Sequence, residues 1–178
     1  YITTFGKCFG GGLPIGIIAV NKSIENKIKK LKSRIFFGGT FSANSISTYI
    51  GHTTVNYIIK NKDKIYQKID TRSNFFYKKL NDIINNEKIN VSLYRFHSIF
   101  RLVFTLNEVK NRVQRDFFEK RFNNKIRSFR NFLLSNSINY PSNGIIFISE
   151  QTSMKDINIL LKYFKLGLFK FFKKNKKN

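Results

Sequence analysis

The sequence is poor in proline, tryptophan, cysteine and acidic residues. Its 178 residues include two prolines, no tryptophan and one cysteine, Cys8. A single cysteine excludes an internal disulfide and leaves the redox compartment open. No apolar run is long enough to span a bilayer, and no signal-peptide pattern is seen, so we expect a cytoplasmic protein without a membrane partner.

Acidic residues are outnumbered 33 to 10 by Lys and Arg, which gives a formal net charge of +23. Such a charge is typical of nucleic-acid-binding modules. We favour compositional drift instead, because Lys, Asn, Ile, Phe and Tyr, whose codons are rich in A and T, are abundant together. No nucleic-acid motif accompanies the charge, and the lysines are spread along the chain apart from the tail at 173–177. Nucleic-acid binding is therefore the weakest of the functional alternatives.

The spacing of apolar residues predicts a mixed α/β architecture. Short strands are expected at 3–5 and 15–20, and a helix is expected from Ile24 after a Ser23 cap. A long helical pattern follows from residue 46. The polar stretch 61–63 is interpreted as a break in that pattern and as the domain boundary. The stripe expected to be buried on the long helix consists of Ile46, Ile50, Thr53 and Tyr57.

The remainder is predicted to be a smaller α+β domain of helices packed on a short sheet. Ser153 and Asp156 have the spacing of a capping box, and an amphipathic helix follows them. The elements expected before it are a helix at about 62–86, strands at 91–96 and 99–105, a helix at 117–135 and a strand at 144–149. This gives two domains, 1–61 and 62–178.

The most informative segment is residues 3–16, which read TTFGKCFGGGLPIG. Lys7 follows a short strand and enters a glycine-rich turn. Glycines allow positive φ angles and a close approach of a ligand to the backbone. Burial in such a turn would lower the pKa of a lysine and make its amine a nucleophile. The spacing fits neither a nucleotide-binding phosphate loop nor a dinucleotide fingerprint.

This segment resembles the cofactor-lysine motif of the class-III aminotransferases, which use pyridoxal 5'-phosphate, and within them it looks most like the glutamate-1-semialdehyde aminomutase branch. Three further segments resemble the family in the same order: 36–44 (FFGGTFSAN), 96–104 (FHSIFRLVF) and 148–157 (ISEQTSMKDI). Ala43 stands where the family usually has Gly, Ser45 stands where it has Pro, and the loop at 140–143 looks shortened. The resemblance implies the C-terminal half of a fold-type-I transferase, with part of the large domain and the small α+β domain.

The resemblance also implies roles for individual residues. Lys7 would form the Schiff base with the cofactor and later shuttle a proton between substrate and cofactor carbons. Gly39 and Thr40 would bind the cofactor phosphate, with Thr40 reaching the phosphate of the partner subunit in a homodimer. The alternative for Thr40 is a simple helix N-cap, which Ser42 or Asn44 would supply equally well.

Other candidate residues are interpreted as structural. His52 and His97 are too far apart, and too poor in partners, to predict a metal site. Cys8 is expected to be a small packing residue. Arg101 on a strand has the chemistry to bind a substrate carboxylate, but a structural ion pair is favoured.

The sequence therefore predicts an enzyme that transfers an amino group to or within a small amino acid or amino aldehyde. The chain does not begin with Met and opens inside a motif, so we expect a fragment. In the resembled family the preceding half carries the aspartate that pairs with the pyridine nitrogen and most of the phosphate loop. The alternative is an inactive truncated product, or a scaffold half that needs another chain.

Overall fold

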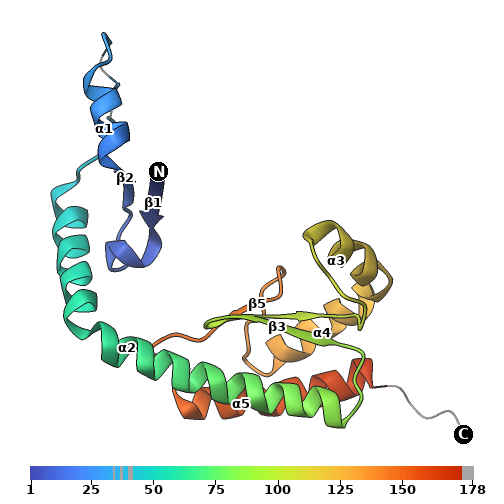
Figure 1. The fold of residues 1–178 in the computed structure, drawn as a ribbon. Coiled ribbons are helices and arrows are strands. Elements are labelled where there is room, and N and C mark those ends of the chain that lie inside the picture. The colour runs from blue at the N-terminus through green and yellow to red at the C-terminus, as the bar shows by residue number, and fades with distance from the viewer. Residues whose placement is uncertain (34, 37, 40–41, 174–178) are drawn as a thin grey trace, which may run out of the picture. The chain divides into compact units, whose positions relative to one another are not determined.

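The computed structural model describes residues 1–33, 35–36, 38–39 and 42–173. The chain divides into two compact units, Tyr1–Asp63 and Lys64–Asn178. Both combine helices with a short antiparallel sheet, so the predicted mixed α/β class is confirmed (Figure 1). Across the described residues, no helix has both the length and the apolar character needed to cross a membrane.

The first unit begins with a two-stranded hairpin. Strand β1 (Ile2–Gly6) pairs antiparallel with β2 (Gly16–Val20), from Ile2 opposite Val20 to Gly6 opposite Gly16. The 3-10 turn η1 (Lys7–Gly10) follows β1 directly. Both predicted strands are confirmed, but none of their ten residues is fully buried.

Helix α1 (Lys22–Lys29) begins earlier than the sequence suggested. The Asn21 side chain accepts a hydrogen bond from the Ile24 backbone N–H at 3.0 Å, so Asn21 is the N-cap and the Ser23 prediction is wrong. Asn and Ser cap helices about equally well. Because both residues lie within three positions of Ile24, their identity alone did not decide between them.

Helix α2 (Ser45–Asn86) is one continuous element of 42 residues. The predicted break at 61–63 is wrong, because none of these polar residues is a proline or a glycine and their helical backbone stays intact. Asn61 donates a side-chain hydrogen bond to the Tyr57 carbonyl at 2.9 Å, one turn earlier. The two compact units divide within this helix, between Asp63 and Lys64.

The sheet of the second unit contains three antiparallel strands in the order β3-β4-β5. They are β3 (Ser92–Phe96), β4 (Ile99–Val103) and β5 (Ile145–Phe147). Arg101 in the middle of β4 lies opposite Tyr94 on β3 and Ile145 on β5. Its neighbours Phe100 and Leu102 are buried, so the side-chain alternation of a strand points Arg101 away from the core.

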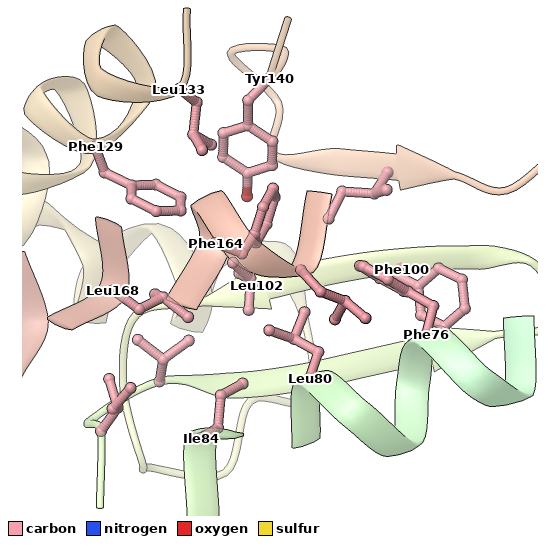
Figure 2. Packing of buried hydrophobic residues seen from close by; sticks show 14 of the residues in the cluster. Phe76, Leu80, Ile84, Phe100, Leu102, Phe129, Leu133, Tyr140, Phe164 and Leu168 are labelled. Atoms are coloured by element: carbon pink, nitrogen blue, oxygen red, sulfur yellow. The ribbon is translucent and has the colours of Figure 1, made fainter. Parts of the chain in front are cut away.

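Among the described residues, the hydrophobic core lies in the second unit. Figure 2 shows side chains from α2, the sheet, α4 (Asn123–Ser135) and α5 (Met154–Phe172) converging. The Phe164 ring lies edge-on to Phe129 at 5.5 Å between centroids, and Phe76 lies edge-on to Phe100 at 5.0 Å. Edge-to-face aromatic pairs of this kind add about 0.5–1.5 kcal/mol to their burial.

The region predicted as one helix at 117–135 is divided. Helix α3 (Arg112–Glu119) is capped by Asn111, whose side chain accepts from the Gln114 N–H. A 3-10 turn, η2 (Lys120–Phe122), separates it from α4. Downstream, Ser153 and Asp156 form the predicted capping box at the start of α5. The buried residues of α5 include Ile157, Leu161, Phe164, Leu168 and Phe172, which form the apolar face of the predicted amphipathic helix.

Candidate functional site

Lys7 lies at the junction of β1 and η1 with a backbone φ of 56°. An L-residue in this left-handed region is strained by roughly 1–2 kcal/mol. Its side chain is exposed, and no hydrogen bond or ion pair joins its amine to another described residue. The desolvation expected from the sequence is therefore absent, and the amine is open to solvent.

The turn that follows Lys7 is fixed by close packing on α2. Gly11 has a φ of 59°, and a Cβ there would lie 2.4 Å from the Thr54 hydroxyl and 2.8 Å from Ile50. On the helix side, a Cβ at Gly51 would lie 3.0 Å from the carbonyl oxygen of Phe9. Only residues without a side chain allow this approach, so glycine is required on both surfaces of the contact.

The same contact corrects the predicted stripe on α2. Ile46, Thr53 and Tyr57 are exposed, whereas Ser47 and Gly51 are the buried residues of this part of the helix. Of the predicted stripe, only Ile50 is partly buried and packs on the turn at Gly11, while the buried positions of this face are small residues. A face of small residues carries no hydrophobic signal, so the sequence pattern did not reveal it.

The second motif forms a turn that leads into α2. Ser42 N–H donates to the Gly39 carbonyl at 2.9 Å, and Ala43 has a φ of 53°. Left-handed backbone favours glycine, the residue that the resembled family usually has at this position. Asn44 accepts a hydrogen bond from the Ser47 N–H, so it acts as the N-cap. Thr40 lies outside the described residues.

The two motifs share a hollow of about 940 Å³ within the first unit. Residues 14–18 line one side of it, and Gly39 with residues 42–44 and the start of α2 line the other. The structure therefore brings the end of the glycine-rich turn and the Gly39 turn together. Lys7 is not among the residues that line this hollow.

Carboxylates are nearly absent from the first unit. Residues 1–63 contain Glu25 and Asp63 only. Glu25 pairs with Lys29 and Lys22 on α1, and hydrogen bonds from these two lysines lower the pKa of its exposed carboxyl group. The described part of this unit therefore provides a lysine amine and backbone amides that could contact a ligand. The carboxylate of Glu25 is already paired with lysines of α1.

The remaining candidates lie as follows. His52 on α2 is exposed, with Asn56 within 3.1 Å of its ring. His97 forms the β3–β4 turn with a φ of 51°. Cys8 is exposed, so the packing role predicted for it is wrong. Arg101 lies 3.9 Å from the Glu119 carboxylate, a long ion pair on the outer side of the sheet.

Comparison with known proteins connects these motifs to one family. Residues 2–97 match the model of the family described as Aminotransferase class-III. The chain is 30% identical to a glutamate-1-semialdehyde 2,1-aminomutase from Methanobrevibacter smithii over 97% of its own length and 40% of the relative. An enzyme of the same name from Fusobacterium nucleatum is 26% identical over 99% of this chain and 40% of the relative.

A solved structure agrees in fold. An omega-transaminase from Sphaerobacter thermophilus superposes with a TM-score of 0.74 at 15% identity, covering 94% of this chain and 38% of that one. At this identity the likeness concerns the fold alone. The chain spans about two fifths of the length of the curated relatives it matches.

Proposed function

The chain belongs to the class-III aminotransferase family, and on that premise we propose that it forms the lysine-bearing part of a pyridoxal-phosphate enzyme that transfers an amino group. The substrate is a small amino acid or amino aldehyde. Residues 1–61 belong to the large domain and 62–178 form the small domain. The complete protein works as a homodimer, and the names of both curated relatives favour transfer within one molecule.

The observation that carries the proposal is the backbone of Lys7. A lysine is held in a left-handed conformation directly after a strand, in front of a turn locked against α2 by Gly11 and Gly51. Strained backbone of this kind persists only where the surroundings fix it, and it gathers at functional sites. Among 24 lysines, only Lys7 and Lys88 have this conformation in the described chain.

The residues present fit part of what the cofactor requires. When bound, pyridoxal phosphate supplies an electron sink for the substrate carbon. Lys7 would hold the cofactor through its Nζ atom, and the same primary amine would be the group that moves the proton. The backbone around Gly39 and the hydroxyl of Thr40 would bind the phosphate, because a turn before a helix N-terminus suits an anion. Asn44 acts as the N-cap, so helix α2 does not need a cap from Thr40.

The pyridine nitrogen of pyridoxal phosphate needs a carboxylate as its partner, and the first unit has no suitable one. Glu25 is paired with two lysines on its own helix, and Asp63 is an exposed residue midway along α2, at the end of the first unit. We therefore infer that amino transfer requires a further polypeptide segment, which carries the acidic partner. This requirement also favours the alternative in which the chain alone is an inactive scaffold half.

A chimera tests the proposal. The chain replaces the matching two fifths of the M. smithii relative, and amino transfer is measured with added pyridoxal phosphate. Lys7→Arg keeps the positive charge but removes the nucleophilic primary amine. We therefore expect activity to fall by at least about a thousandfold, as is usual when an activated nucleophile is removed. Lys27→Arg on the exposed side of α1 is the matched control and should retain full activity.

Two results would count against the proposal. Equal activity of the Lys7→Arg and Lys27→Arg chimeras would remove Lys7 from the reaction. A folded chimera that binds the cofactor but shows no amino transfer would favour the scaffold alternative.

A further inference from the structure

The second unit contains a hollow on the outer side of its sheet. It has a volume of about 650 Å³, within the range typical of small-molecule sites. It lies between β4, helix α3 and the turn before β5, and all of its lining residues belong to the second unit. Its lining includes two arginines, Arg101 and Arg115, and two neutral polar residues, Ser142 and Asn143.

Arg101 is incompletely paired. Its Nε atom is buried and has no hydrogen-bond partner among the described residues. Its closest carboxylate oxygen, Oε2 of Glu119, lies 3.9 Å from Nη2, which is beyond hydrogen-bond length. A buried, unpaired guanidinium N–H is destabilising, since the group has lost its water without gaining another partner.

The carboxylate of Glu119 already interacts with other partners besides Arg101. Its Oε1 atom accepts a hydrogen bond from the Phe104 backbone N–H at 3.1 Å, and its Oε2 atom lies 3.6 Å from Arg115 Nε. One carboxylate therefore faces a backbone amide and two guanidinium groups. Asp116 is likewise engaged by Arg115 and Arg112.

The hollow carries an excess of positive charge. Its lining includes four cationic side chains and two carboxylates, which leaves a net charge of +2. Burial, and then the neighbouring Arg115, lower the pKa of Arg101 below its ordinary value, against the opposing effect of Glu119. An arginine stays charged even so. An anion that entered the hollow would relieve the repulsion between the arginines, whose guanidinium groups lack a full set of carboxylate partners.

We propose that this hollow is a binding site for a small dianion, a phosphomonoester or a dicarboxylate, held by Arg101 and Arg115. The guanidinium fork matches the oxygen spacing of carboxylates and phosphates. Ser142 and Asn143 add neutral hydrogen-bonding groups to the lining. The site does not depend on the amino-transfer reaction, because every residue that forms it lies in the second unit.

The test uses the 178-residue chain and follows the arginine Nε–Hε signals by NMR. Inorganic phosphate and succinate are titrated separately at constant ionic strength set with chloride. We expect saturable shifts of the Arg101 and Arg115 signals with one of these anions or both, and the anion that saturates identifies the ligand class. Acetate, a monoanion, should bind at least about tenfold more weakly, since it leaves half of the excess charge unmatched.

Variants separate the hollow from the general basic surface. Arg101→Gln and Arg115→Gln should each weaken binding at least tenfold. Arg127→Gln, an equal charge change on the exposed side of α4 and outside the hollow, should leave the affinity within about twofold. If Arg101→Gln fails to fold, Arg115→Gln and the titration of the unmodified chain still show whether the hollow binds a dianion.

Linear, non-saturating shifts with both dianions would overturn the proposal. So would an equal loss of affinity in Arg127→Gln and Arg115→Gln, because it would indicate general charge attraction. In either case Arg101 is the structural half of a long ion pair.

Discussion

Two antiparallel ladders in this chain have the same length and very different surroundings. The β1–β2 and β3–β4 pairs each align five residues. In the first pair no residue is fully buried, although β2 reads GIIAV, an apolar run. In the second, Phe100, Leu102 and Val103 of β4 are buried.

The comparison shows that hydrogen-bond ladders alone do not account for the stability of this chain. Every buried large hydrophobic side chain in the described residues lies between Phe76 and Phe172. Isolated two-stranded hairpins are marginal in water, and strands that read as continuous apolar runs are normally covered on both faces. The second unit can therefore hold itself together, whereas the first unit requires additional contacts.

The largest expected difference comes from isoleucine truncation. Ile157 on α5 is fully buried, whereas Ile18 on β2 is 62% exposed. Ile157→Ala should lower the free energy of unfolding of the second unit by about 2–5 kcal/mol, because it removes packed methyl groups and leaves a cavity. Ile18→Ala should change it by less than about 0.5 kcal/mol.

Urea unfolding followed by near-ultraviolet circular dichroism measures both isoleucine variants. Similar losses of stability in the two would mean that β2 contributes to the same cooperative core. That result would contradict the view that only the second unit is stabilised by a buried core.

A second pair of substitutions adds a methyl group instead of removing one. At Gly167 on α5, a Cβ would lie 2.7 Å from the buried Phe129 ring, whereas at Gly16 nothing lies within 4 Å. Overpacking in a core outweighs the better helix propensity of alanine, so Gly167→Ala should destabilise by about 1–2 kcal/mol. Gly16→Ala should be neutral within about 0.5 kcal/mol. Thermal unfolding checks the order, and a neutral Gly167→Ala would contradict the packing described for α5.

The smallest expected difference concerns helix caps. Ser153 caps α5 and Asn21 caps α1. Ser153→Ala should cost the second unit about 1 kcal/mol, because α5 is part of its core. Asn21→Ala should leave that unit's unfolding unchanged, since α1 buries no residue. Equal effects of the two substitutions would show that α1 and α5 unfold together.

The α5 cap also has a pH dependence with a definite sign. The Ser153 side chain and backbone donate hydrogen bonds to Asp156 and lower its pKa in the folded state. Its contribution is therefore present above the unfolded pKa of about 3.9 and is lost as the pH falls through the lower folded value. Comparing Ser153→Ala with the unmodified chain between pH 7 and pH 2 should show the difference in stability shrinking toward the acid end.

The sequence revealed elements wherever local chemistry decided the outcome. The capping box at Ser153 and the apolar periodicity of α5 were predicted because both signals lie within a few residues. The continuity of α2 was missed because the polar residues at 61–63 were interpreted as a helix break, an effect that only proline or glycine would have had. Asn21 was missed as a cap because Ser23 offered the same chemistry two residues later.

The candidate site was only partly predictable. The glycines pointed to a fixed turn after Lys7, and the contacts of Gly11 and Gly51 with their neighbours explain why they are needed. The exposure of the Lys7 amine did not follow from its neighbours in sequence, because burial depends on segments distant in the fold. Nor did the half-paired state of Arg101, which depends on how Glu119 divides its oxygens between partners.

The most direct test of the account maps where pyridoxal phosphate attaches. In the chimera described above, borohydride reduction fixes the bound cofactor to its lysine, and peptide mass spectrometry then locates it among the lysines of the chain. We expect the added mass on the peptide that contains Lys7 and its loss in Lys7→Arg. Labelling spread over many lysines, or labelling unchanged in Lys7→Arg, would contradict it.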